Sequence, residues 1–381
     1  MLPDDPSKIP FNQPFLTGRE LAYIRQAVES GKISGNGAFT QKCQGWLERR
    51  YGFRKVLLTT SCTDALEMAA ILADVGPGDE VIVPSFTFVS TALAFVRQGA
   101  RITFADSRPD HPNLDLDRIE PLITPRTKAL VVVHYAGVAC DMDQALALAA
   151  RHNLLVIEDA AQAIDATFQG RPLGGIGHLG CFSFHETKNI ITGEGGALVV
   201  NDERFVRRCE IIWEKGTNRA EFFRGEVNKY GWVDVGSSFL PSEIVAAFLY
   251  AQLEHLDEIQ ARRIALWNAY AERLDDVARQ GRLQLPRIPA GASNNAHMFH
   301  VVCGSLEERS ALIAHLKQRG ILAVFHYLPL HRSPYYAPRH DGRALPHADR
   351  FSDCLLRLPM YYGLEIDQVE RICNEVRAFY S

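Results

Sequence analysis

Short, solidly apolar runs separated by helix-like stretches constrain this sequence more than any other feature. The runs are rich in Val, Ile and Phe and do not alternate with polar residues. They are Glu80–Pro84, Arg101–Asp106, Ala129–Gly137, Leu154–Asp159, Gly180–Phe184 and Gly196–Val200. Continuous apolar runs of this length are typical of strands that are buried on both faces of a sheet.

The stretches between these runs predict helices. Thr63–Gly76, Ser90–Gly99 and Met142–Asn153 carry apolar residues three and four positions apart, and each ends close to a Gly or an Asn. Strands that alternate with helices in this way indicate an α/β fold with a mainly parallel sheet.

The second part of the chain predicts a smaller α/β unit. Pro241–Ala278 has the spacing of one or two long helices, His297–Cys303 is typical of a strand, and Glu307–Gly320 of a helix. A chain of 381 residues is long enough for two domains. We expect residues 1–250 to form an N-terminal segment and a large domain. Residues 251–381 are expected to form a long linking helix and a small C-terminal domain.

Charge and composition exclude several classes of protein. The formal net charge is −4, which does not favour a nucleic-acid-binding protein with a basic face. The N-terminal sequence MLPDDPSKIPFNQPF lacks the apolar core of a signal peptide. No run approaches the ~20 apolar residues that a membrane span needs. We therefore expect a cytoplasmic protein that does not bind a membrane.

Cysteine and histidine spacing argues against disulfides and metals. The eight cysteines are scattered and form no CxxC pair, so free thiols in a reducing compartment are expected. The thirteen histidines form no HExxH motif, so we expect no metal site. The glycine string GIGHLG, Gly175–Gly180, follows a turn and precedes an apolar run. A dinucleotide fingerprint has the opposite context, so we interpret this string as unrelated to nucleotide binding.

Lys188 raises the central question about function. It is the single lysine of the sequence CFSFHETKNIITGEGGALVV, between an aromatic run and the glycines Gly193, Gly195 and Gly196. It can be a plain surface lysine. Alternatively, a lysine in a partly dry site has a lowered pKa and can attack a carbonyl to form a Schiff base.

Three neighbouring motifs each allow a structural and a functional interpretation. Asp159 ends a predicted buried strand, where it can cap a helix or face a ligand at the carboxyl edge of the sheet. Ser61 and Thr63 precede a helix, where they can cap it or hold a phosphate. Phe86 and Phe88 can belong to the core or lie over a flat ring.

Together these motifs match the needs of pyridoxal 5'-phosphate (PLP), which requires an amine, an acid facing its ring nitrogen, phosphate donors and an apolar contact. The sequence order SCTDAL, PSFTFVST, HYAG, IEDAAQA and SFHETKNIITGEGGAL resembles the DegT/StrS family of sugar-nucleotide aminotransferases. The resemblance covers nearly the whole chain. It implies the aspartate-aminotransferase-like fold of PLP-dependent transferases of fold type I, with PLP bound in the large domain.

The resemblance also implies roles for individual residues. Lys188 would bind PLP covalently and carry the proton between substrate and cofactor. Asp159 would pair with the ring nitrogen, Gln162 would contact the ring hydroxyl, and Phe88 would stack on the ring. The phosphate would be held by Cys62, Thr63 and Ser183 and, from a second subunit, by Ser237 or Ser238 in place of the family's asparagine. The expected active unit is therefore a homodimer with shared active sites.

Five further residues are candidates for substrate binding. Arg219, Arg224 and Lys229 lie in the polar, aromatic segment around Trp213–Ser238, which predicts a long surface loop. They either meet a nucleotide diphosphate or are solvated loop charges. His326 and His331 either line the mouth of the site or are packed histidines.

The resemblance implies an aminotransferase that takes its amino group from L-glutamate. The implied acceptor is a dTDP-linked keto-sugar, dTDP-4-keto-6-deoxyglucose, giving dTDP-4-amino-4,6-dideoxygalactose for a cell-surface polysaccharide such as enterobacterial common antigen. A PLP-dependent dehydratase, an enzyme acting on another keto-sugar, and a regulator that binds PLP without turnover are the alternatives. Lys188 favours amino transfer, because the dehydrating relatives carry a histidine at its position.

Overall fold

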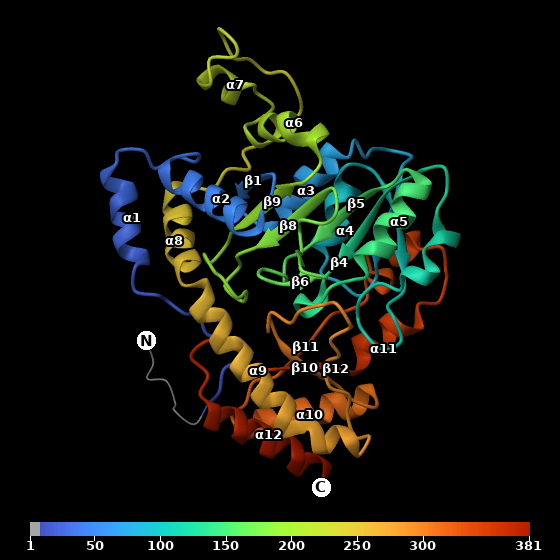
Figure 1. Cartoon of the computed structure of the whole chain (residues 1–381). Helices are drawn as coiled ribbons and strands as arrows, with labels where there is room; N and C mark the ends of the chain where they lie inside the picture. The colour runs from blue at the N-terminus through green and yellow to red at the C-terminus, as the bar shows by residue number, and fades with distance from the viewer. Residues whose placement is uncertain (1–7) are drawn as a thin grey trace.

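The computed structural model describes residues 8–381, which form an α/β molecule with a large and a small sheet (Figure 1). The seven-stranded sheet has the order β1-β9-β8-β5-β4-β2-β3. Its strands are β1 (Lys55–Thr59), β2 (Glu80–Pro84), β3 (Arg101–Ala105), β4 (Thr127–Val133), β5 (Leu155–Asp159), β8 (Leu179–Ser183) and β9 (Gly196–Val200). The six apolar runs of the sequence therefore all form strands, as predicted.

The large sheet is mainly parallel, with one reversed strand. β2, β3, β4, β5 and β8 pair in parallel, whereas β9 runs antiparallel to both β8 and β1. The alternation of strands and helices predicts parallel pairing, but β8 and β9 are not separated by a helix. The chain therefore returns directly beside β8, and only a reversed strand allows this.

Alternate residues of each central strand enter two separate hydrophobic clusters. In β5, Val156 packs on one face of the sheet with α2 (Ala38–Tyr51), α5 (Met142–His152) and α8 (Glu243–Glu254). Ile157 packs on the other face with α3 (Cys62–Leu72), α4 (Ser90–Arg97) and α6 (Glu203–Trp213). Burial on both faces explains why these strands read as continuous apolar runs.

The small sheet consists of β10 (Phe299–Val302), β12 (Leu355–Leu358) and β11 (Val324–Phe325), paired antiparallel in that order. Its own core includes residues of α9 (Leu256–Arg279), α10 (Leu306–Gln318) and α12 (Ile366–Tyr380). The predicted long helical segment is two helices, α8 and α9, which meet at His255. The domain boundary that we propose between residues 250 and 251 lies inside α8.

The predicted surface loop projects from the body as an arm, which we define as residues 213–238. It contains the short helix α7 (Arg219–Phe223) and lies on the side of the large sheet opposite β10–β12 (Figure 1). The remaining elements are α1 (Glu20–Glu29), α11 (Pro346–Cys354), β6 (Thr167–Phe168) and β7 (Arg171–Pro172).

The eight cysteines are free thiols, as predicted. Within residues 8–381, no helix is both long enough and apolar enough to cross a bilayer. The interpretation of the N-terminal sequence rests partly on residues 1–7, which lie outside the described residues.

Candidate active site

Lys188 lies in the connection that joins β8 to β9. This connection closes on itself through backbone bonds, because Phe184 N–H donates to Gly195 O at 2.8 Å and Glu186 N–H to Gly193 O at 2.9 Å. Gly193 adopts a φ of +80°, a conformation that other residues rarely adopt. The loop therefore presents a single lysine at the carboxyl end of β8.

Gly196 explains the second part of the glycine cluster. A Cβ atom at this position would lie 2.5 Å from the backbone nitrogen of Cys62 and from the carbonyl carbon of Ser61. Only glycine lets β9 pass this close to the first turn of α3. The glycines behind Lys188 therefore shape the lysine loop and place it beside the start of a helix.

The environment of the Lys188 amine favours its neutral form. Burial lowers the pKa of Lys188 from 10.5 to about 8, and the nearby Arg357 guanidinium acts in the same direction. Cys62 and Asp159 oppose the shift. A neutral amine is the nucleophilic form of lysine, so this side chain is suited to attack an aldehyde near neutral pH.

Asp159 ends β5 and is buried, with only 6% of its surface exposed. Its Oδ2 accepts from Thr91 Oγ1 at 2.7 Å, and its Oδ1 accepts from Ala161 N–H at 3.1 Å. Burial raises the pKa of Asp159, while these two hydrogen bonds and the Lys188 charge lower it. No helix begins at Asp159, so the helix-cap interpretation does not apply. The sequence analysis did not identify Thr91, which lies within the quoted PSFTFVST motif.

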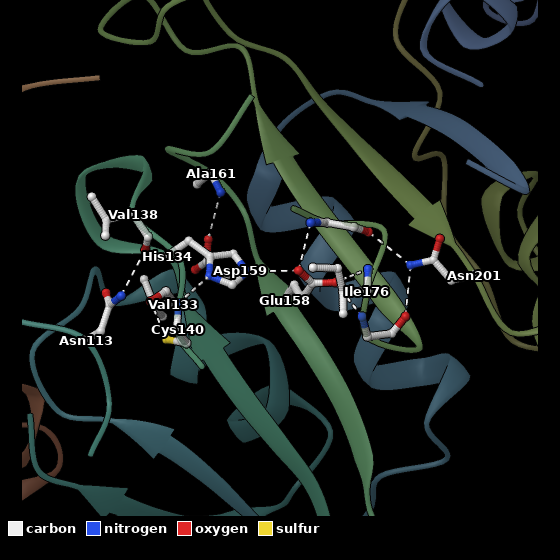
Figure 2. A network of polar contacts seen from close by, with 12 residues as sticks. Asn113, Val133, His134, Val138, Cys140, Glu158, Asp159, Ala161, Ile176 and Asn201 are labelled. Atoms are coloured by element: carbon white, nitrogen blue, oxygen red, sulfur yellow. Dashed lines mark hydrogen bonds and ion pairs between the residues drawn. The ribbon is translucent and has the colours of Figure 1, made fainter. Parts of the chain in front are cut away.

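A buried polar network fixes the strand end that carries Asp159 (Figure 2). The backbone N–H of His134 donates to the backbone carbonyl of Asp159 at 3.2 Å. The ring Nε2 of His134 lies 2.9 Å from Glu158 Oε2. His134 Nδ1 accepts from Cys140 N–H at 3.2 Å, so the ring carries its proton on Nε2 and donates to Glu158. Both side chains are fully buried. The network therefore holds Glu158, the residue that precedes Asp159 in β5, in place.

The GIGHLG string and the preceding Gly174 bind a carboxylate of the protein itself, that of Glu158. Backbone N–H groups of Gly174, Ile176 and Gly177 donate to the Glu158 carboxylate at 2.8, 2.8 and 2.5 Å. Asn201 Nδ2 donates to the carbonyls of Gly174 and Gly177. Figure 2 shows Asn201 beside the turn that contains Ile176. The string follows a turn and leads into β8, as predicted. Its backbone amides bind the Glu158 carboxylate rather than a nucleotide phosphate.

The first turn of α3 provides donors for an anion. Ser61 caps the helix by accepting from Asp64 N–H at 3.1 Å. The N–H groups of Cys62 and Thr63, at the first two helical positions, have no partner within the helix. The Thr63 hydroxyl lies 2.8 Å from that of Ser90. Ser183 ends the adjacent β8 and is nine-tenths buried. This donor set fits a phosphate.

The two phenylalanines of the PSFTFVST motif have different environments. Phe86 is buried and packs against Tyr135 and Tyr327. Phe88 is 55% exposed, and its ring centroid lies 6.1 Å from that of Tyr327. Phe86 is therefore a core residue, whereas Phe88 is free to lie over a flat ligand. Gln162 is buried, and its Nε2 donates to Tyr327 Oη at 3.1 Å.

The two arginines predicted on the arm contact other arm residues and α6. Arg224 is paired with Glu210 and Glu226, and the Arg219 guanidinium lies 5.1 Å from the centre of the Phe223 ring. Lys229 and Ser238 are exposed. Figure 1 shows the arm on the side of the large sheet opposite β10–β12.

His326 and His331, the two histidines predicted near the mouth of the site, contact different groups of residues. His331 is buried, its Nδ1 lies 2.7 Å from Ser85 Oγ, and its Nε2 faces Asp349 at 3.5 Å. These contacts favour the packed-histidine interpretation, because both ring nitrogens face other groups of the protein. His326 lies beside Tyr135 and Arg357, at 3.3 Å from each. Tyr327 and Arg357 had no counterpart in the sequence analysis.

The residues at this site fit PLP by the chemistry of their donors. An amine with a lowered pKa, a buried carboxylate, a helix N-terminus and an exposed aromatic ring gather at the carboxyl edge of β5 and β8. These are the four groups that PLP requires from a protein.

Comparison with known proteins matches nearly the whole chain to one family. Residues 14–377 match the DegT/DnrJ/EryC1/StrS aminotransferase family. A GDP-perosamine synthase of Caulobacter vibrioides is 35% identical over 97% of both chains. The spore coat polysaccharide biosynthesis protein SpsC of Bacillus subtilis is 32% identical over 97% of this chain and 96% of its own.

Solved structures share the fold along nearly the whole chain. DesV of S. venezuelae, solved with a ketimine intermediate, superposes with a TM-score of 0.89 at 34% identity over 98% of both chains. Spr1654 of Streptococcus pneumoniae, solved in its PLP form, gives a TM-score of 0.89 at 26% identity over 98% of both chains. The chain belongs to the DegT/DnrJ/EryC1/StrS aminotransferase family, and it is a PLP-dependent aminotransferase.

Proposed function

We propose that the protein transfers the amino group of L-glutamate to a nucleotide-linked 4-keto-6-deoxy sugar in polysaccharide biosynthesis. One observation carries the amino transfer, namely the Lys188 amine with its lowered pKa beside the buried Asp159. A sugar acceptor is supported by the similarity to a GDP-perosamine synthase and to SpsC. We further propose dTDP-4-keto-6-deoxyglucose as the acceptor.

PLP, when bound, accepts the amino group of the donor, withdraws electrons from the carbon that loses its proton, and passes the amino group on. The chain supplies the remaining chemistry. The neutral Lys188 amine is placed to take a proton from the donor carbon and to deliver it to the cofactor. The Asp159 carboxylate is placed to keep the ring nitrogen protonated, since an anion beside that nitrogen favours its cationic form.

The other residues have positioning roles in this proposal. The first turn of α3, with Cys62 and Thr63, and the hydroxyl of Ser183 are proposed to hold the phosphate. Phe88 is proposed to cover one ring face and Gln162 to contact the ring oxygen. Ser237 or Ser238, with the charged residues of the arm, is proposed to reach the site of a partner subunit in a homodimer.

Product analysis with a panel of acceptors tests the proposal. The purified protein is incubated with L-glutamate and either dTDP-4-keto-6-deoxyglucose or a GDP- or UDP-linked keto-sugar. An aminated dTDP-sugar together with 2-oxoglutarate is the expected outcome. Amination of the GDP-linked sugar alone would change the assigned nucleotide. A dehydrated product, or no aminated sugar from any acceptor, would refute the proposed reaction.

The pH dependence of PLP capture follows from the Lys188 environment. Only the neutral amine reacts, so the capture rate of the apoprotein is expected to rise about tenfold per pH unit up to about pH 8 and then level off. In the unfolded chain, the Lys188 amine keeps its proton up to its ordinary pKa of 10.5. The free energy of unfolding is therefore expected to rise as pH rises from 8 to 10.5, where only the unfolded state binds this proton. Stopped-flow absorbance measures the capture rate. A profile that still rises up to pH 10 would contradict the assigned environment.

A further inference from the structure

The start of α4 contacts several parts of the site at once. Phe88, which is proposed to cover the ring, precedes the helix, and its carbonyl accepts from the backbone N–H of Thr91 at 3.2 Å. The Ser90 hydroxyl lies 2.8 Å from that of Thr63 in the first turn of α3. The Thr91 hydroxyl donates to Asp159 Oδ2 at 2.7 Å. The first turn of α4 therefore lies beside the residues proposed for the ring face, the phosphate and the ring nitrogen.

The threonine hydroxyls in this segment do not serve the helix itself. Serine and threonine at a helix start commonly cap it, which would be a purely structural role. The N-cap of α4 is Val89, however, and no side chain caps this helix. Thr87 and Thr91 are buried, with 2% and 0% of their surface exposed. Their hydroxyls therefore have a role outside the helix.

Thr87, Thr91 and Asp159 form a hydrogen-bonded chain with one possible direction. Thr91 Oγ1 lies 2.8 Å from Thr87 Oγ1 and 2.7 Å from Asp159 Oδ2. An ionised carboxylate only accepts, so the single proton of the Thr91 hydroxyl is donated to Asp159. Thr87 must then donate its own proton to the Thr91 oxygen. Because each bond in such a chain strengthens the next, Thr87 makes Thr91 a better donor to the carboxylate.

The Asp159 carboxylate depends on donors because it is buried. Burial raises its pKa, whereas the hydrogen bonds from Thr91 and from the backbone N–H of Ala161 lower it, as do Lys188 and His134 nearby. The remaining titratable groups that face this carboxylate, and whose pKa its charge raises, are Cys62, Cys181 and Tyr327. Of the two hydrogen bonds, that of Thr91 comes from a side chain, so a substitution can remove it.

We propose that Thr91, with Thr87 behind it, is a positioning residue that holds Asp159 ionised and turned toward the ring nitrogen of PLP. Oδ2 accepts from Thr91 and Oδ1 from Ala161, so two bonds fix the plane of the carboxylate. Each oxygen keeps a further lone pair for the ring N–H. Without Thr91, the carboxylate is free to rotate and takes up a proton more readily. This inference rests on the proposed pairing of Asp159 with the ring nitrogen.

Thr91→Val tests this inference, because valine keeps the shape of threonine and removes the hydroxyl. In protein loaded with PLP, kcat/KM for L-glutamate is expected to fall roughly 10- to 100-fold at pH 7, as for loss of a hydrogen bond to a charged group. The loss should grow as pH is lowered, and the cofactor absorbance should move toward that of Asp159→Asn. Thr91→Ser restores the hydroxyl and is expected to stay within about threefold of wild type.

The apoprotein gives a readout that does not depend on the cofactor. Aspartate labelled at the carboxyl carbon is incorporated, and the Asp159 signal is identified by its absence in Asp159→Asn. Followed by NMR, Asp159 is expected to protonate at a higher pH in Thr91→Val than in wild type. Thr87→Val keeps the bond to Asp159 and should show the same change at a smaller size. It therefore tests the inference even if Thr91→Val does not fold.

Thr40→Val is the matched control. Thr40 of α2 is buried like Thr91, and its hydroxyl donates to another buried carboxylate, that of Glu243. This variant should lower the melting temperature and leave the cofactor spectrum and the Asp159 titration unchanged. Equal changes in Thr40→Val and Thr91→Val, or an Asp159 titration that Thr91→Val leaves unchanged, would overturn the inference. A wild-type spectrum in Asp159→Asn would instead refute the proposed pairing with the ring nitrogen, whatever the titration shows.

Discussion

Replacing Lys188 with alanine is expected to abolish amino transfer. Lys188 carries the only amine that the described site places beside Asp159, and it is proposed both to hold PLP covalently and to move the proton of the donor carbon. Loss of a nucleophile that also acts as acid and base lowers turnover by roughly 10⁴-fold or more. Single-turnover mixing with L-glutamate, monitored by cofactor absorbance, measures the loss.

The matched control is Lys128→Ala, which removes an exposed lysine from β4. This variant should retain wild-type turnover. The Lys188 amine forms no ion pair among residues 8–381 and its burial disfavours its charged form, so Lys188→Ala should melt within a few degrees of wild type. Normal amino transfer by Lys188→Ala would show that another group performs the chemistry.

Replacing Asp159 with asparagine is expected to have the second largest effect. An amide cannot carry the negative charge that keeps the ring nitrogen protonated, so the cofactor loses much of its ability to withdraw electrons. Loss of an electrostatic interaction of this kind lowers kcat on the order of 10³-fold. The absorbance maximum of the bound cofactor should shift as well, because ring protonation changes. Steady-state rates and the absorption spectrum together measure this effect.

Asp106 provides a matched control for Asp159. It follows β3 as Asp159 ends β5, is equally buried, and accepts from the backbone N–H of Ala348 at 2.8 Å. Asp106→Asn should lower the melting temperature and leave the cofactor spectrum unchanged, since its carboxylate contacts α11 rather than the site. A kcat for Asp159→Asn within tenfold of wild type would contradict the role assigned to the ring nitrogen.

The sequence allowed most of the large sheet to be predicted, but not all of its geometry. Runs such as Glu80–Pro84 are apolar because both faces of their strands are buried, so the strand signal is local. The direction of β9 depends on how the chain returns beside β8, and an apolar run contains no such information. β12 was not predicted, because Arg357 interrupts its apolar pattern and only packing against the large domain explains a charge there.

The site shows the same division between local and long-range signals. Asp159 could be found because it ends a recognisable strand, and Lys188 because it follows one and precedes a glycine cluster. Thr91 and Tyr327 contact Asp159 and Gln162 across 68 and 165 residues of sequence, and no local pattern reveals such pairings. The sequence left open whether His331 lines the site or is packed, and its contact with Ser85, 246 residues away in sequence, favours the packed interpretation.

The most direct test of the account is to locate the covalent attachment of PLP. Protein loaded with PLP is reduced with borohydride, digested, and mapped by peptide mass spectrometry. The account predicts a phosphopyridoxyl group on Lys188 and an Asp159→Asn variant that is labelled at the same lysine. Labelling of a different lysine, or of none, would contradict the assignment of Lys188 and with it the active site described here.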